Sequence, residues 1–221
     1  MDTELESLKN EVHRKLGRNI ILFQKIELLL KFLLANSKIS GYLDELKIIQ
    51  ERQNKIFEKQ TLGQLVKQFF ENIILNSKKI DDEPNVLKEK GIWISIDCQF
   101  SSDSTVYQDY EQQKKSLALI VAERNELVHH FFLKWDLTLF DGWNSAEHYL
   151  DKQYDKIEKE FQHLKVLAEL LEEGRKDIPN FVKQFLDFTQ TNEGKALFKI
   201  QTIESKVINL LHDIAVKKIQ I

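Results

Sequence analysis

The amino-acid sequence predicts an all-α fold, a helical bundle of long helices with one short β element. The 221 residues include only seven glycines and two prolines, far below the roughly 12% that average chains carry. A sandwich, barrel or propeller needs many more turn residues. Apolar residues recur at steps of three and four along most of the chain, which is the pattern of amphipathic helices. Only one segment alternates apolar and polar side chains as a half-buried strand does.

Two helices with N-terminal capping boxes are predicted in the first third of the chain. Thr3 and the glutamate three positions later open the first. Its continuation over residues 20–35 is apolar on most sides, which predicts a helix in the middle of the core. Thr61 and the glutamine three positions later open the second helix. The intervening residues 37–60 are weakly amphipathic, and we interpret them as a helix as well.

The strand signal follows a polar segment. Residues 76–91 are polar and include a proline, so we expect a loop there. Residues 92–100 then place three isoleucines and Cys98 on one face of a strand. A lone strand needs a partner, and we expect either residues 78–87 or the same strand of a second chain. Cys98 is the chain's single cysteine, and we expect it to pack as a small core residue.

The second half of the chain predicts four more helices. The first spans residues 104–135, and a loop over 136–143 with an Asp-Gly turn follows it. Asn144 caps the next helix, which we expect to end at Gly174. Asp177 begins a short helix through residue 188, and a last helix starts near residue 192.

A strict heptad stripe runs along the helix that follows Asn144. Its apolar positions step by 4, 3, 4, 3, 4 and 3 residues, which suits packing at a shallow angle against a second helix. The stripe consists of Leu150, Tyr154, Ile157, Phe161, Leu164, Ala168 and Leu171. We expect two parts in the chain, a helical domain over residues 1–175 and a C-terminal helical appendage over 176–221 that packs on it.

Charge and hydropathy exclude several classes of function. The formal net charge of −3 argues against a long footprint on duplex DNA. No apolar run is long enough to cross a membrane, and the first residues carry charges where a secretory signal would be apolar. The single cysteine fits a reducing compartment. We therefore expect a cytoplasmic protein that acts neither on membranes nor on duplex DNA.

One arginine stands out on the helix predicted over residues 104–135. On a helical wheel its apolar face is formed by Leu117, Ile120, Val128 and Phe131, and Arg124 falls in the middle of that face. A guanidinium cannot stay unpaired in a core. Arg124 therefore pairs with a buried acid from another helix, faces a subunit interface, or lines a polar cleft and binds an anion.

The residues that follow Arg124 favour phosphate chemistry. Asn125 and His129 are four positions apart and share a helix face. Arginine offers a fixed fork of donors to phosphate oxygens, and histidine exchanges protons near neutral pH. Attack of an RNA 2′-hydroxyl on its own phosphate needs both functions and no metal. His129, His130 and His148 show no metal-ligand spacing, so we expect no metal and no other cofactor.

The run RNELVH, residues 124–129, resembles the signature of the HEPN superfamily. The segments KLGRNIILFQKIELLLKFLLANS and ERNELVHHFF are similar to a bacterial HEPN group that is sometimes fused to LOTUS-type RNA-binding domains. The resemblance covers roughly residues 5–175, and residues 176–221 show no LOTUS domain. It implies an all-α bundle and a metal-independent endoribonuclease of toxin–antitoxin, phage-defence or RNA-processing systems. Other members of the superfamily only bind RNA or have lost activity.

The resemblance also implies roles for residues. Arg124 and His129 would be catalytic, with Asn125 as their polar support. Their side chains diverge by about 140° on one helix, and family members commonly bring both copies together in a two-fold dimer. Some toxins of the superfamily carry a modifiable tyrosine two residues after the histidine, and here that position is Phe131.

The expected partners are RNA, a second copy of the chain and, in a toxin setting, an antitoxin or other regulatory protein. Two alternatives to the nuclease stay open. One is a catalytically silent module that binds RNA or protein on the same scaffold. The other is a structural bundle whose Arg124 is paired internally. Trp93, Trp135 and Trp143 are interpreted as packing residues rather than base-stacking platforms, and the lysines of the predicted 76–91 loop as solvated.

Overall fold

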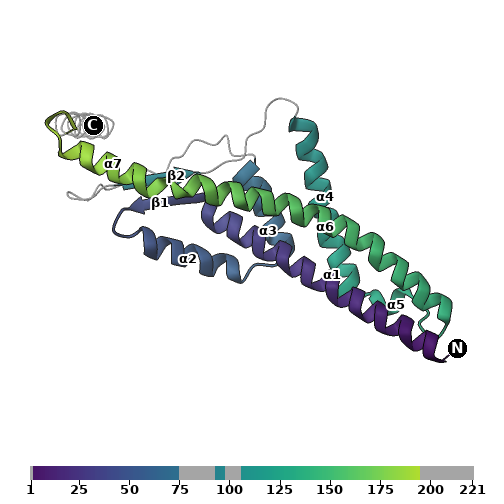
Figure 1. Cartoon of the computed structure of the whole chain (residues 1–221). Helices are drawn as coiled ribbons and strands as arrows, with labels where there is room; N and C mark the ends of the chain where they lie inside the picture. Colours follow the sequence, from purple (N-terminus) through teal and green to yellow (C-terminus); the bar gives the residue numbers. More distant parts are fainter. Residues whose placement is uncertain (1, 75–92, 98–105, 195–221) are drawn as a thin grey trace, which may run out of the picture. The chain divides into compact units, whose positions relative to one another are not determined.

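A computed structural model describes residues 2–74, 93–97 and 106–194 of the chain. It has an all-α fold with one two-stranded sheet, as the sequence predicts (Figure 1). The chain forms two compact units, Met1–Leu171 and Glu172–Ile221. The boundary lies inside the longest helix, α6. None of the helices among the described residues is long and apolar enough to cross a membrane.

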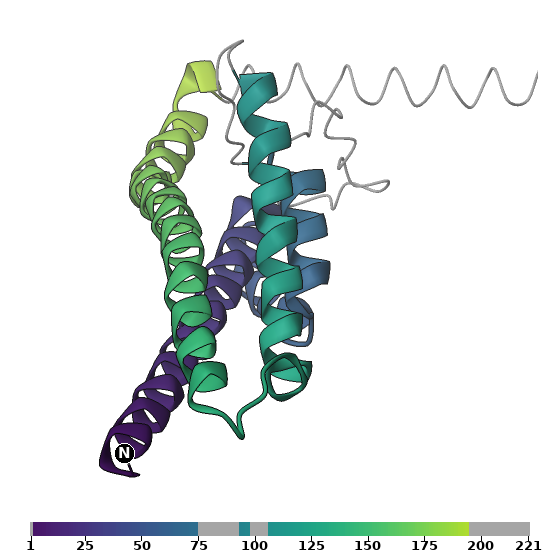
Figure 2. The same cartoon turned by 90° about the vertical axis from the view of Figure 1, so that its right-hand side faces the viewer.

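Long helices make up the first unit, and a short sheet lies among them. In Figure 2 the purple α1, the teal α4 and the green α6 are its longest helices, and the short α5 follows directly after α4. Its elements in chain order are α1 (Asp2–Ser37), β1 (Lys38–Tyr42), α2 (Leu46–Glu58), α3 (Leu62–Phe69), the π-helical turn η1 (Phe70–Ile74), β2 (Trp93–Asp97), α4 (Val106–His129), α5 (Phe131–Lys134) and α6 (Phe140–Lys176).

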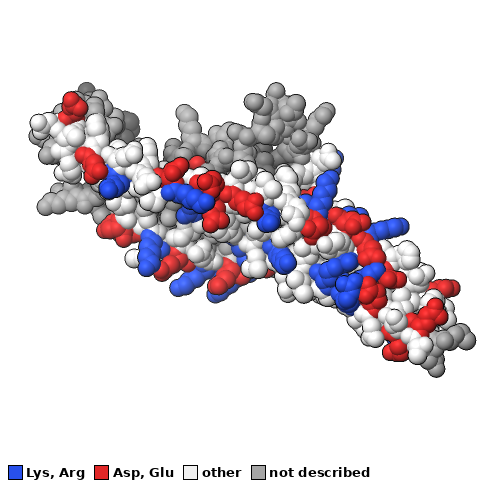
Figure 3. Space-filling view, viewed as in Figure 1, with Lys and Arg blue, Asp and Glu red and all other residues white. Residues whose placement is uncertain are grey.

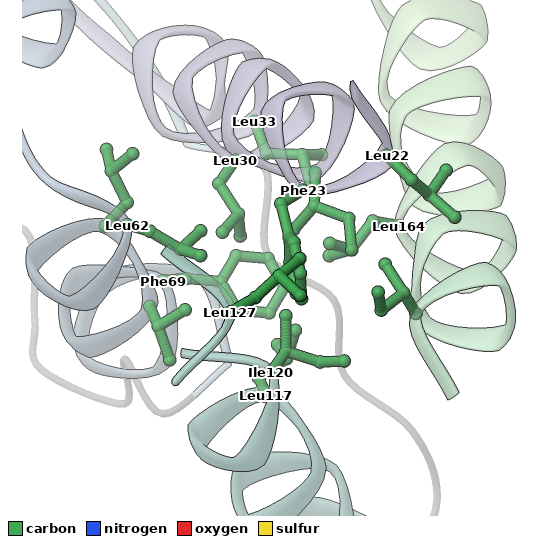
Figure 4. Close-up of a cluster of buried hydrophobic side chains, with 14 of the residues drawn as sticks. Leu22, Phe23, Leu30, Leu33, Leu62, Phe69, Leu117, Ile120, Leu127 and Leu164 are labelled. Carbon is green, nitrogen blue, oxygen red and sulfur yellow. The ribbon is translucent and has the colours of Figure 1, made fainter. Parts of the chain in front are cut away.

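The core forms where α1, α3, α4 and α6 meet (Figure 4). Leu30 and Leu33 of α1 are fully buried, as the predicted central helix requires. Ile21 and Leu28 of the same helix are exposed, so the helix is buried on one side rather than all round. The predicted capping box at Thr61 is confirmed. The Thr61 N–H donates to Gln64 Oε1 at 2.9 Å, and the Thr61 side chain accepts from the backbone N–H of Gln64.

The strand β2 is confirmed, and its partner among the described residues is the strand β1, which was not predicted. It pairs antiparallel with β1, so that Lys38 lies opposite Asp97 and Tyr42 opposite Trp93. The prediction of one helix over residues 37–60 is therefore wrong at its start and right from Leu46 onward. Gly41 lies so close to Ile49 of α2 that a Cβ would overlap the isoleucine side chain. Residues 76–91 and Cys98 lie outside the described part of the chain.

Helix α6 begins earlier and ends later than predicted. It starts at Phe140, so the expected Asp-Gly turn and the Asn144 cap are wrong. Trp143 is buried, and its indole N–H donates to the Leu137 carbonyl at 2.7 Å, which fixes the start of the helix against the preceding loop. A Cβ on Gly142 would overlap the Asp136 carbonyl. Gly174 does not end the helix, which continues to Lys176.

The heptad stripe of α6 is confirmed as a buried seam. Leu150, Ile157, Leu164 and Leu171 are buried, and the two aromatic members of the stripe pack against the core at its edge. Charged groups add a second link between α1 and α6. The Lys15 Nζ, on a largely buried side chain, lies 2.8 Å from Glu147 Oε1 and 2.5 Å from Asp151 Oδ2. Removing one partner of such a pair leaves the other charge poorly solvated.

The second unit contributes the helix α7 (Ile178–Gln190) to the described residues. The helix begins directly after Asp177, where a helix start is predicted, although the Asp177 side chain makes no capping hydrogen bond. Pro179 occupies the first turn, where the missing N–H of proline has no cost. Three of its phenylalanines, Phe181, Phe185 and Phe188, are exposed. Most of the helix predicted from residue 192 onward lies outside the described residues.

Candidate functional site

The motif residues lie on the last turns of α4, which ends earlier than predicted. The predicted helix over residues 104–135 is broken at His130, whose backbone leaves the helical region at φ −127° and ψ −2°. His129 is therefore the last residue of α4, and the short helix α5 follows. This break exposes His129 at a helix end instead of placing it in mid-helix.

The buried face of α4 differs from the face that the wheel predicts. Leu117, Ile120 and Leu127 are buried, whereas Val128 is 51% exposed and Arg124 is half-buried. Arg124 therefore lies at the edge of the buried face, and its predicted place in the middle is wrong. The reason is that α4 packs against α3 and hydrogen-bonds to α6, so the arc facing these helices is the buried one.

Arg124 lines a shallow cavity of about 200 Å³ in the first unit. The cavity lies between α1, α3 and α4, and Figure 4 labels two residues of its apolar lining, Phe23 and Leu62. Its polar lining residues are Arg124, Gln24 and Glu27. The full lining is Ile20, Phe23, Gln24, Glu27, Leu62, Arg124 and Val128.

No acidic group among the described residues forms an ion pair with Arg124. The nearby acids are paired elsewhere. Glu27 Oε1 lies 2.7 Å from Lys31 Nζ, Glu123 Oε1 lies 2.7 Å from Lys156 Nζ, and Glu126 Oε1 lies 3.4 Å from Lys134 Nζ. Of the three explanations for Arg124, the buried acid from another helix is therefore absent within the described chain, and the open cleft and the subunit interface remain.

Asn125 and His129 are both exposed on α4, one turn apart. The His129 ring lies 6.2 Å from that of His130, centre to centre, and His130 is exposed too. Because Arg124 and His129 diverge around the helix, one chain places Asn125 beside His129 and leaves Arg124 on a neighbouring face.

A polar network that the sequence analysis missed anchors the motif to α6. Glu123, directly before Arg124, accepts hydrogen bonds from the Tyr149 hydroxyl at 2.9 Å, from Gln153 Nε2 at 2.9 Å and from Lys156 Nζ at 2.7 Å. Asn19 of α1 extends the network by donating to Gln153 Oε1 at 3.0 Å. The available signal was a polar pair, Tyr149 and Gln153, one turn apart beside the heptad stripe.

The network shifts the ionisation of its members. Burial alone would raise the pKa of Glu123, but the hydrogen bonds from Lys156, Gln153 and Tyr149 outweigh it and hold the pKa below its ordinary value. Burial raises the pKa of Tyr149, and its bond to Glu123 raises it further. Glu123 is therefore an anion with three donors, which suits an anchor and not a proton-transfer group.

The other candidate residues pack inside the first unit. Trp143 is buried, the Trp135 ring lies 5.6 Å from that of Tyr149, and the Trp93 ring lies 5.2 Å edge-on to that of Tyr42. Among the described residues no group of three or more His, Cys, Asp or Glu side chains is placed to hold a metal ion. The lysines of the predicted 76–91 loop lie outside the described residues.

Exposed apolar side chains follow the motif in sequence. On the one face of the molecule that Figure 3 shows, acidic and basic side chains are interspersed, without a large patch of either sign. Val128, Phe132 and Leu133 follow Arg124 in sequence and are all exposed, Leu133 to 84%. Clustered apolar exposure of this kind marks interaction surfaces.

Comparison of the chain with family models, with curated proteins and with solved structures gives no match.

Proposed function

We propose that the protein is a metal-independent endoribonuclease of HEPN type that works as a homodimer. One observation carries the proposal. Arg124 is half-buried, lines an open cavity, and has no acidic partner among the described residues. A guanidinium in that position has donors to spare for an anion, and RNA phosphates are anions that match its fork. The resemblance of the run RNELVH to the HEPN signature supports RNA cleavage without a metal as the reaction.

The proposed reaction uses three side chains of α4. His129 removes the proton from an RNA 2′-hydroxyl, and the 2′-oxygen forms a bond to the adjacent phosphorus. Arg124 holds the phosphate and stabilises the negative charge that grows on its oxygens. The bond from phosphorus to the 5′-oxygen breaks, and that oxygen takes a proton from a protonated histidine. The products are a 2′,3′-cyclic phosphate and a 5′-hydroxyl, and Asn125 orients His129 or the substrate.

Two features of the first unit support the proposed dimer. Arg124 and His129 do not meet within one chain, so His129 of the partner subunit would complete each site. The exposed Val128, Phe132 and Leu133 next to the motif provide apolar area for such an interface. An antitoxin or other regulatory protein could use the same area when the site is silenced.

The test is cleavage of total cellular RNA in EDTA by the wild-type chain beside two single variants. His129→Ala should lose cleavage, whereas His148→Ala should keep it. His148 is a matched control because it is exposed on α6 and bonds only to the Asn144 carbonyl of its own helix. If all three proteins bind RNA but leave it intact, the nuclease proposal is wrong and the protein is a catalytically silent RNA-binding module.

A further inference from the structure

The cavity beside Arg124 has features that phosphate binding does not use. Its lining is mostly apolar, with Ile20 and Phe23 from α1, Leu62 from α3 and Val128 from α4. The polar residues Gln24, which is exposed, and Glu27, which is half-buried, also line it. An apolar hollow with a few convergent polar groups is how proteins usually bind small ring systems. The Arg124 guanidinium alone is enough to bind a phosphate. Phosphate binding therefore does not account for the apolar residues of the lining or for Gln24 and Glu27.

We propose that this cavity binds one nucleobase of the RNA, and that the base is guanine. This inference rests on the proposed function, because it assigns the base next to the phosphate that Arg124 holds. A volume of about 200 Å³ accommodates a flat ring system and excludes a helix or a folded peptide. The apolar lining would cover the faces of the ring, and the polar groups would read its edge.

The polar groups select guanine by their hydrogen-bonding character. A carboxylate only accepts hydrogen bonds, and guanine offers two parallel donors, N1–H and the N2 amino group, on its Watson–Crick edge. Adenine, cytosine and uracil each have a hydrogen-bond acceptor next to their donor on this edge. That acceptor would face the Glu27 carboxylate, which can only accept, and the two would repel each other. The O6 acceptor of guanine would take a donor from Gln24, whose amide makes no hydrogen bond to another described residue.

The carboxylate is held in place for this task. Glu27 Oε1 accepts from Lys31 Nζ at 2.7 Å, and Lys31 also donates to the Glu58 carbonyl of α2 at 3.1 Å. The ion pair between Glu27 and Lys31 fixes the Glu27 side chain. The Lys31 charge also offsets the repulsion between the Glu27 carboxylate and an RNA phosphate. A carboxylate has about four lone-pair positions, so Oε2 and the rest of Oε1 stay available for the two guanine donors.

The test measures binding without cleavage. The full chain with His129→Ala is titrated in EDTA against fluorescein-labelled decauridine, and against the same oligomer with one central guanosine, adenosine or cytidine, and anisotropy gives each Kd. The guanosine oligomer should bind about tenfold more tightly than the others, which is the discrimination expected of one bidentate contact. Adding Glu27→Gln should remove that preference. Adding Glu51→Gln should keep it, because Glu51 is an exposed glutamate of α2 that does not line the cavity.

Arg124→Ala in the same background should weaken all four oligomers alike, since a phosphate contact carries no base information. Equal affinity for the four oligomers would overturn the guanine pocket and leave the nuclease proposal intact if the wild-type chain cleaves RNA. A guanine preference in a chain that cleaves nothing would support the pocket and refute the nuclease. If Glu27→Gln changes the sedimentation of the protein and not its base preference, a partner chain fills the cavity and the inference is wrong.

Discussion

Replacing Leu164 with alanine should destabilise the protein strongly and leave its site intact. Leu164 is 0% exposed and lies in the core between α6, α1 and α4 (Figure 4). A buried leucine truncated to alanine costs about 2–5 kcal/mol, the larger values applying where the surroundings cannot collapse into the cavity. For a chain of this size each kcal/mol lowers Tm by about 2–4 °C. The melting temperature should therefore fall by about 4–20 °C.

The matched control is Leu170→Ala, six positions along the same helix. Leu170 is 57% exposed, so its truncation should change stability by no more than about 0.5 kcal/mol. Thermal melting followed by far-ultraviolet circular dichroism compares the two variants with wild type. RNA cleavage is then measured at a temperature where all three are folded, and it should not differ. Equal melting temperatures for the two variants would refute the packing that places α6 in the core.

Three further predictions concern the motif and its anchor. Arg124→Ala should keep the fold, because the side chain has no acidic partner among the described residues, and should abolish cleavage and weaken RNA binding. A chain that unfolds on this change would show that Arg124 is a structural residue. Glu123→Gln should cost about 1–3 kcal/mol, because the buried Gln153 amide loses its charged acceptor. The lowered pKa of Glu123 stabilises the fold at pH values above its unfolded pKa, and this contribution is lost as the pH falls through the folded pKa. Urea titrations at several pH values should therefore show the difference between wild type and Glu123→Gln shrinking toward low pH, and a constant difference would contradict the assigned anchor. Sedimentation of the wild-type chain at micromolar concentration should show a dimer that Leu133→Asp dissociates, and a monomer throughout would contradict the shared site.

Local signals explain why much of the fold was predictable from the sequence. The capping box at Thr61 and the heptad stripe of α6 are short-range patterns, and each forms as expected. The strand β1 was missed because its conformation depends on pairing with β2 far along the chain, which no local pattern shows. The early start of α6 was missed because Gly142 resembles a turn residue, whereas the burial of Trp143 decides the boundary.

The candidate site was predictable in its residues and not in its surroundings. Arg124, Asn125 and His129 all lie on α4, as the periodicity indicates. A helical wheel cannot show which apolar arc the neighbouring helices cover, so the exposure of Val128 was not foreseen. The cavity and the Glu123 anchor combine residues from helices far apart in sequence. Contacts of that kind follow from tertiary packing, which no local pattern records.

The central claim is that His129 and Arg124 cleave RNA without a metal, and end-group analysis of the products tests it most directly. Purified wild-type protein is incubated with a defined single-stranded RNA in EDTA, and the fragments are examined for their 3′ ends. We predict 2′,3′-cyclic phosphate or 3′-phosphate ends, formed at a rate that His129→Ala lowers by about 10²–10⁴-fold. Fragments with 3′-hydroxyl ends, activity that disappears on chelation, or unchanged cleavage by His129→Ala would contradict the mechanism.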